Sequence, residues 1–166
     1  MNTADISSLL SRLRPRDREE LVEYGFDHAS ALAAFAAPAV LSRVFSARAS
    51  PQALIAFHAL TPRALVVSMV AAPEWRSVLR DVWRWSQREA KPQLLRLGYH
   101  RAECRTMQGH EDAIRFLEHL GFRQECPIPD FGASGAAFIQ YAWRLENHVP
   151  HQDTQGATRA ATPATP

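Results

Sequence analysis

Residues 109–122, GHEDAIRFLEHLGF, combine a short amphipathic helix with the glycine that ends it. The apolar residues recur at steps of three and four and so share one helix face, which consists of Ala113, Phe116, Leu117 and Leu120. Gly121 can adopt the left-handed backbone conformation that ends a helix, because it has no Cβ. The residues from Phe122 on, FRQECPI, are typical of a strand. The stretch therefore predicts a helix directly followed by a strand.

Three short helices are predicted before residue 39. Asp5 is the candidate N-cap of the first helix, which continues through ISSLLSRL. Pro15 suits the first turn of a second helix, and Gly25 ends it. An alanine-rich third helix, ASALAAFAAPA, ends at Pro38.

Residues 40–72 change to a β-strand pattern. The runs VLSRVFSAR, QALIAFHAL and RALVVSMVAA are rich in Val, Ile, Leu and Phe, and the dipeptides Ser50-Pro51 and Thr61-Pro62 separate them as turns. We therefore expect an antiparallel meander of three strands. A long helix then begins at Pro73 and ends at Gly98. Two further strands are expected, in YHRAECRT and, after the loop PDFGASG, in AAFIQYAWRL.

Composition indicates one globular domain. The chain has 166 residues, of which 46% are hydrophobic and 22% are charged, and we place the domain at residues 1–145. Residues 146–166 are rich in Thr, Ala and Pro, so we expect a flexible tail there. We find no apolar run long enough to span a membrane and no signal peptide, which predicts a cytoplasmic location.

The charged residues and cysteines point to no particular ligand. The net charge is only +2, and the arginines are spread among nearly as many acidic residues, so a nucleic-acid partner is not expected. Cys104 and Cys126 lack the paired spacing of a zinc site, so no metal is expected. A stripe on the long helix favours a solvated face over a phosphate-binding face; it consists of Arg76, Arg80, Arg84 and Arg88.

The tryptophans of the long helix are divided between core and surface. The apolar stripe is assigned to Trp75, Val78, Leu79, Val82, Trp83, Ser86 and Ala90, at steps of three and four. Trp85 falls outside this stripe. It is therefore the candidate for an exposed residue that contacts a partner.

Residues 102–125, AECRTMQGHEDAIRFLEHLGFRQE, resemble the C-terminal half of the GNAT superfamily of N-acetyltransferases. In that family a strand leads through a polar residue into a helix of the form A-x-x-F-Y-x-x-x-G-F. The resemblance extends more weakly over residues 5–146. It implies a single α/β domain with a mixed, mostly antiparallel sheet flanked by helices. Family members commonly begin with a strand, whereas this chain reaches Asp5 almost at once, so we expect that strand to be missing and a sheet edge to be exposed.

The segments ADISSLLSRLRPRDREELVEYG and SQREAKPQLLRLGYHRAECRTMQGHEDAIRFLEHLGF also resemble the small GNAT-like proteins of tailed bacteriophages. Some of those proteins are virion-associated. This resemblance implies a location in the virion or the host cytoplasm. It also implies contacts with other virion proteins, or with copies of the same chain, through the sheet edge and the C-terminal tail.

The resemblance places acetyl-CoA at the junction of the third strand and the long helix. Relatives bind the diphosphate there with a loop of the form Q/R-x-x-G-x-G/A, whose backbone amides point at the phosphates. The corresponding residues, AAPEWRS, contain no glycine, Pro73 has no amide hydrogen, and Glu74 adds a negative charge. We therefore expect no cofactor. If the chain is active, the acetyl-CoA site would be formed by Ala71, Ala72, Arg76 and Ser77.

No catalytic residue is assigned with certainty by the sequence. The resemblance aligns Leu117 with the tyrosine that protonates the departing thiolate, and leucine has no proton to donate. His58, in the second strand, is either a hydrogen-bonded structural residue or a base. His110 is either a polar residue at the start of a helix or a catalytic group.

Two functions remain open. The first is a degenerate GNAT-fold protein that serves as a structural or interaction component of a bacteriophage virion. The alternative is an active N-acetyltransferase that moves an acetyl group from acetyl-CoA to an amine, with His58 or His110 handling protons. The missing glycines and Leu117 favour the first.

Overall fold

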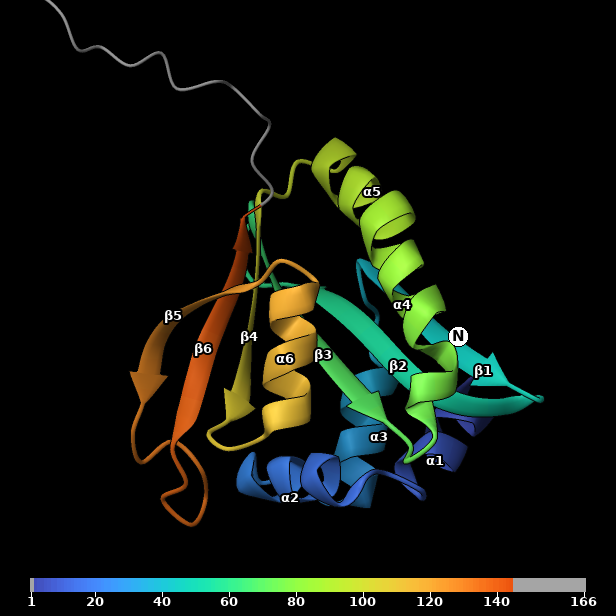
Figure 1. Cartoon of the computed structure of the whole chain (residues 1–166), viewed down its shortest axis with the longest axis vertical. Coiled ribbons are helices and arrows are strands. Elements are labelled where there is room, and N and C mark those ends of the chain that lie inside the picture. Colours follow the sequence, from blue (N-terminus) through green and yellow to red (C-terminus); the bar gives the residue numbers. More distant parts are fainter. Residues whose placement is uncertain (1, 145–166) are drawn as a thin grey trace, which may run out of the picture.

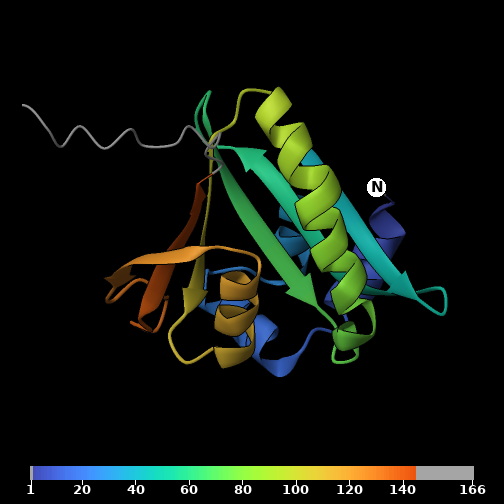
Figure 2. The same cartoon turned by 45° about the horizontal axis from the view of Figure 1, so that its top comes forward.

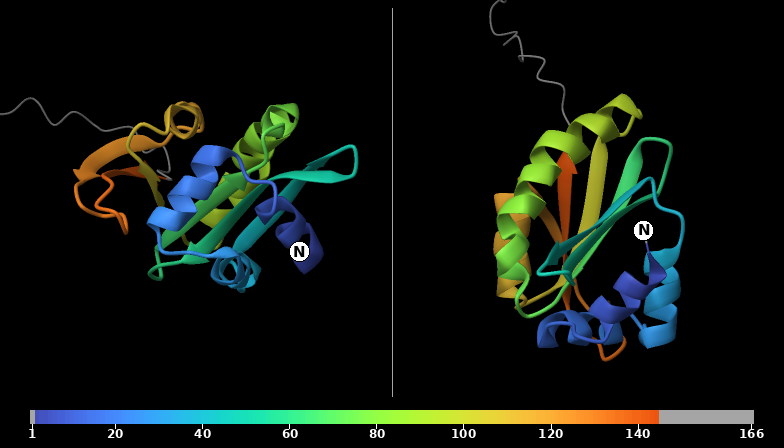
Figure 3. Two further views of the ribbon diagram at one scale, coloured as in Figure 1. Left: turned by 90° about the horizontal axis from the view of Figure 1, so that it is seen from below. Right: turned by 90° about the vertical axis from the view of Figure 1, so that its right-hand side faces the viewer.

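A computed structural model describes residues 2–144, which form one sheet with helices on both faces (Figures 1 and 3). The predicted tail, residues 146–166, lies outside the described residues. No helix of the described part is long and apolar enough to cross a membrane. The elements in chain order are α1 (Thr3–Leu10), α2 (Pro15–Glu23), α3 (His28–Ala36), β1 (Leu41–Ala47), β2 (Ser50–Ala59), β3 (Ala64–Ala71), the 3₁₀ turn η1 (Trp75–Val78), α4 (Leu79–Trp85), the π-helical segment η2 (Ser86–Ala90), α5 (Lys91–Arg96), β4 (Arg101–Met107), α6 (Glu111–His119), β5 (Arg123–Ile128) and β6 (Phe138–Arg144).

The sheet has six strands in the order β1-β2-β3-β4-β6-β5. The predicted meander is confirmed, because β1 pairs antiparallel with β2 and β2 with β3. Only β3 and β4 run parallel. Among residues 2–144, β1 is the first strand along the chain and follows three helices. It forms one edge of the sheet, where the sequence predicts that a strand is missing.

Two local predictions are corrected by the structure. The N-cap of α1 is Asn2, whose side chain accepts a hydrogen bond from the backbone of Ala4, whereas Asp5 lies within the first turn. The turn between β1 and β2 lies at Arg48 and Ala49, with φ of 50° and 61°. These values suit the tight turn that joins antiparallel strands. The strands therefore continue to the turn, and Ser50-Pro51 belongs to β2 instead of forming the turn.

The long helix buries a different tryptophan from the one expected. Trp85 is buried, with 5% of its surface exposed, whereas Trp83 is 37% exposed. The prediction that Trp85 is an exposed contact residue is therefore wrong. The helix carries two stripes with helical spacing, and the one through Val78, Val82 and Trp85 faces the sheet because the rings of β1 and β2 provide its packing partners.

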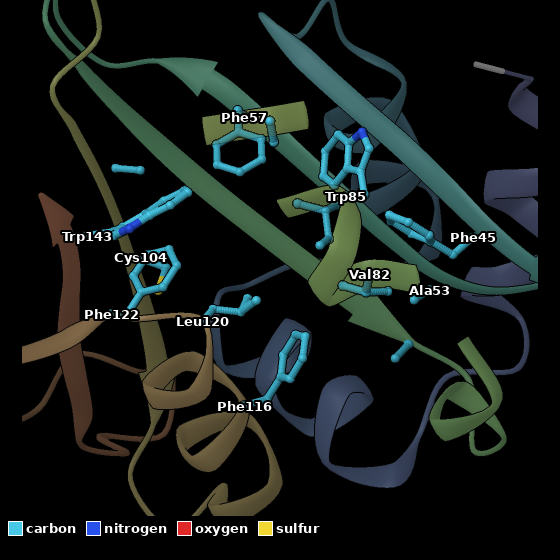
Figure 4. Close-up of a cluster of buried hydrophobic side chains, with 14 of the residues drawn as sticks. Phe45, Ala53, Phe57, Val82, Trp85, Cys104, Phe116, Leu120, Phe122 and Trp143 are labelled. Atoms are coloured by element: carbon cyan, nitrogen blue, oxygen red, sulfur yellow. The ribbon is translucent and has the colours of Figure 1, made fainter. Parts of the chain in front are cut away.

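The core is divided by the sheet into two layers. On β2, Ala53, Ile55 and Phe57 point toward α4, whereas Leu54 and Ala56 point toward α1 and α3. This alternation follows from the two-residue period of a strand. Figure 4 shows the first layer, in which Phe45 and Phe57 surround Trp85, and Phe122 packs near Trp143 beside α6. Residues 109–122 thus contain α6, which ends before Gly121, as predicted. The φ of Gly121 is +91°.

Candidate functional site

The parallel pairing of β3 and β4 covers only three residue pairs, Ala64–Val66 with Arg101–Glu103. Beyond these pairs the two strands diverge, as Figures 1 and 2 show. A cavity of about 390 Å³ lies along the diverging segments. We call it the β3–β4 cavity. Its walls come from both faces of the sheet.

The β3–β4 cavity has an apolar side and a polar side. The apolar side is formed by β3 and by the elements packed on the α6 face, and includes Met69, Trp75, Phe116, Leu117, Phe122 and Trp143. The polar side is formed by α2 and by the end of β4, and includes Asp17, Glu20, Tyr24, Arg105, Thr106 and His110. Such a combination of apolar walls and a few converging polar groups is typical of a ligand site.

Helix α2 connects the ends of the diverging strands through its side chains. The carboxylate of Asp17 accepts a hydrogen bond from the backbone N–H of Ala71, the last residue of β3, at 2.7 Å. Glu20 accepts one from the hydroxyl of Thr106 on β4 at 3.1 Å. The Tyr24 hydroxyl donates to the carbonyl of Arg105 at 3.2 Å. These bonds join two strands that have no ladder between them at this level.

His110 lies between two carboxylates of α2. Its Nδ1 is 2.7 Å from Glu20 Oε2, and its Nε2 is 3.4 Å from Asp17 Oδ1. Only 3% of the residue is exposed. It occupies the N-cap position of α6, as predicted for a polar residue at the helix start. Its side chain makes no capping hydrogen bond to the helix. No group of three His, Cys, Asp or Glu residues within the described part is arranged to hold a metal ion.

Arg14 completes this buried cluster. Its guanidinium forms two hydrogen bonds to Asp17, at 3.1 and 2.7 Å, and its backbone N–H donates to the carbonyl of Ala71 at 2.9 Å. Burial raises the pKa of Asp17, although Arg14 acts in the opposite direction. A carboxylate held this way is a costly buried charge that depends on its partners.

The predicted cofactor residues are engaged with the protein itself. The backbone N–H of Ala71 donates to Asp17, and that of Ala72 donates to the carbonyl of Gln52. The backbone N–H and the hydroxyl of Ser77 both donate to the carbonyl of Glu74, at 2.9 and 2.7 Å. The exposed guanidinium of Arg76 lies 3.3 Å from Asp112. Cofactor binding at these residues stays a prediction.

Both predicted histidines line the β3–β4 cavity, but at different levels. His58 pairs with Val66, at the level where β3 and β4 still pair, whereas His110 follows the far end of β4. Four strand residues separate the two levels, which corresponds to about 13 Å. The alternation along β2 places His58 on the face that carries α1 and α3.

Sequence reasoning missed the polar face of α2. Asp17, Glu20 and Tyr24 are spaced by three and four residues, so a helix brings them to one face. The same helix carries four other charged residues, and its spacing does not say which face is buried. The spacing of Asp17, Glu20 and Tyr24 is therefore visible in the sequence, but an ordinary solvent-exposed helix would show the same kind of spacing.

The fold matches solved structures of acetyltransferases. The ribosomal-protein-S18-alanine N-acetyltransferase from Escherichia coli matches with a TM-score of 0.65 at 12% identity, over 90% of this chain and 91% of that chain. Aminoglycoside 6'-acetyltransferase type Ii gives 0.65 at 17% identity, over 87% and 90% of the two chains. The Salmonella typhimurium protein yncA, solved with its cofactor acetyl-CoA, gives 0.58 at 16% identity, over 75% and 77%.

No family model matches the sequence, and no curated protein is significantly similar to it. Identities this low establish the architecture and leave the activity open. The TM-scores of 0.65 over about nine tenths of both chains show agreement in overall arrangement. The chain therefore has the GNAT fold.

Proposed function

We propose that the chain is an N-acetyltransferase that moves an acetyl group from acetyl-CoA to an amine within the β3–β4 cavity. The observation that carries this proposal is the end of the β3–β4 pairing after three pairs, which leaves a cavity bordered by both faces of the sheet. For acetyl transfer, the amine must be held against the carbonyl carbon of the thioester. A cavity with walls on both faces offers each of them its own side.

The cavity fits one part of the cofactor better than another. Its wall of Trp75, Phe116 and Trp143 suits the acyl and pantetheine part. The turn at residues 71–77 does not suit the diphosphate, since the N–H groups of Ala71, Ala72, Trp75 and Ser77 already donate within the protein. The carboxylate of Glu74 would also repel it. The proposal therefore places the acyl and pantetheine part of acetyl-CoA in the cavity. It does not place the diphosphate at the turn.

Glu20 is the group that we propose as the base. Its Oε2 is held by Thr106 and His110, whereas its Oε1 has no hydrogen-bond partner within residues 2–144. It lines the cavity and is 15% exposed. Acetyl-CoA, when bound, would supply an acyl carbon for attack by the amine; the bond from that carbon to sulfur would break, and the CoA thiolate would leave and take a proton from water, because Leu117 has none to donate. Glu20 accepts the proton that the amine loses, and Thr106 and His110 hold its carboxylate in place.

The proposal is tested by calorimetric titration with acetyl-CoA and by acetylation of a panel of amines. Glu20→Gln keeps the shape of the side chain but removes the base, so we expect kcat to fall by about 10²- to 10⁴-fold with unchanged acetyl-CoA affinity. Glu19→Gln is the matched control, because the side chain of the neighbouring Glu19 is half exposed and forms an ion pair with Arg16 on the helix surface. An unmodified chain that neither binds millimolar acetyl-CoA nor acetylates any amine contradicts the proposal.

A second candidate is a GNAT-fold protein without transferase activity that serves as a structural or interaction component of a bacteriophage virion. The occupied N–H groups of the turn and the apolar side chain of Leu117 favour it. Its contacts to other virion proteins or to copies of itself would use the edge strand β1 and residues 146–166. Light scattering of the full chain and of a chain ending at residue 145 tests this. A monomer in both cases contradicts self-association.

A further inference from the structure

The β3–β4 cavity extends beneath the helical segments α4, η2 and α6. Its floor there is formed by side chains of β2 and β3 that point to this face, namely Ile55, Phe57, Val67 and Met69. Its wall is formed by α6 and the strands beside it, through Leu117, Leu120, Phe122 and Trp143. We call this part of the cavity the inner chamber. Figure 4 shows Leu120, Phe122 and Trp143 on one side of it and Phe57 on the other.

The inner chamber is covered by contacts between α6 and the long helix. At the first turn of α6, the carboxylate of Asp112 lies 3.3 Å from the guanidinium of Arg76. At the end of α6, Nε2 of Gln87 donates a hydrogen bond to the carbonyl of Leu120 at 3.1 Å. The chamber therefore lies between the sheet and two connected helices. It is continuous with the polar side of the cavity, where Glu20 lies.

The charged residues that line the β3–β4 cavity lie outside the inner chamber. They belong to the α2 segment, to β4 and to the first turn of α6, and are Arg14, Asp17, Glu20, Glu103, Arg105 and Asp112. The chamber itself is bordered by the hydroxyl of Ser86 and the thiol of Cys104 as its polar groups among residues 2–144. An amide buried without a hydrogen bond is costly. A hydrocarbon chain therefore fits the chamber, whereas the amides of a pantetheine arm belong in the rest of the cavity.

The inner chamber is larger than an acetyl group. Its floor spans two strand positions, from Val67 to Met69, which corresponds to about 7 Å. The methyl group of acetyl extends only about 1.5 Å beyond its carbonyl carbon. The whole cavity has a volume of about 390 Å³, whereas an apolar cavity of about 150 Å³ already takes up benzene. An acetyl group would leave most of the chamber walls without contacts.

We propose that the inner chamber binds a linear saturated acyl chain longer than acetyl, with its carbonyl end towards Glu20 and its chain beneath α6. This inference rests on the proposed function, because it names the class of donor, which is an acyl thioester of medium chain length. The bonds that form and break are those of acetyl transfer, and the chain contributes only binding. Longer chains are therefore better donors until the chamber is full.

The test is calorimetric titration of the full chain with 1-butanol, 1-hexanol and 1-octanol, which carry the chain without a thioester or a charge. Burial of each methylene should tighten binding about fourfold, so hexanol should bind roughly 16-fold more tightly than butanol. Val67→Phe adds a ring to the floor and should weaken octanol binding by at least about 10-fold. Val44→Phe is the matched control and should leave it unchanged, because Val44 packs in the layer of α1 and α3.

An affinity that does not rise with chain length, or octanol binding that Val67→Phe leaves unchanged, overturns the proposal. If Val67→Phe does not fold, Leu117→Phe carries the same test from the α6 wall, where the side chain is only partly buried. Transfer from acetyl-CoA and hexanoyl-CoA separates this inference from the proposed function. Alcohol binding that rises with length in a protein that transfers neither group removes the proposed function and leaves the chamber standing. Acetyl transfer without that rise removes the chamber and leaves the proposed function.

Discussion

Replacement of Trp85 by alanine should destabilise the protein far more than replacement of Trp83. Trp85 is 5% exposed, and its ring centroid lies 5.5 Å from that of Phe45 and 6.3 Å from that of Phe57. A buried tryptophan removes roughly 150–250 Å² from water, which corresponds to about 4–6 kcal/mol as an upper bound. Measured substitutions of this type cost about 3–5 kcal/mol, and we expect that range for Trp85→Ala.

Trp83→Ala is the matched control, two residues away on the same helix. Trp83 is 37% exposed, and its nearest ring, that of His119, lies 6.2 Å away. Its loss should change the free energy of unfolding by about 1 kcal/mol or less. Urea unfolding followed by circular dichroism measures both values. If Trp85→Ala does not fold, Trp85→Phe should still be less stable than Trp83→Phe. A larger cost at position 83 than at position 85 would show that the helix presents the other stripe to the sheet.

Three further predictions concern stability. Hydrogen bonding to Arg101 lowers the pKa of Glu125 from 4.5 to about 2. This pair should therefore stabilise the protein by about 1 kcal/mol above pH 4.5 and lose that contribution as the pH falls through 2. The difference between the urea midpoints at about pH 5 and about pH 3 should be smaller for Glu125→Gln than for the unmodified protein. Gly121→Ala should cost about 1 kcal/mol in thermal unfolding, because φ is +91° there, and a cost near zero would contradict this. Asn2→Ala should cost about 1 kcal/mol through the lost cap, whereas Asp5→Ala should be nearly neutral by the same measurement; the reverse order would restore Asp5 as the cap.

Local patterns predicted most of the secondary structure. The helix that Gly121 follows and the three antiparallel strands were recognised because their signals lie within a few residues of each other. The sequence-based predictions are wrong where two local arrangements fit the sequence pattern equally well. Asn2 and Asp5 can both cap a helix, and the long helix carries two apolar stripes. For the long helix, contacts of Trp85 with Phe45 and Phe57 on β1 and β2 decide between the two stripes.

The candidate site could be predicted only in part. His110 was found, because it stands at a recognisable strand-to-helix junction. Asp17 and Glu20 were not found, because their burial depends on α2 lying across the ends of β3 and β4. The hydrogen bond from Ala71 to Asp17 joins residues 54 positions apart, and no local pattern encodes it.

The sequence alone predicted most helices and strands, because hydrophobic periodicity and helix-ending glycines act over short distances, and its resemblance to the GNAT superfamily implied the fold class. It also showed that the turn at residues 71–77 lacks glycine. The tertiary structure alone decided where β3 and β4 part, which carboxylates face the cavity, and that Asp17 occupies the donors around Ala71. The physical reason is that strand separation and side-chain burial are set by packing between segments far apart in the chain, which the sequence pattern of any one segment does not contain.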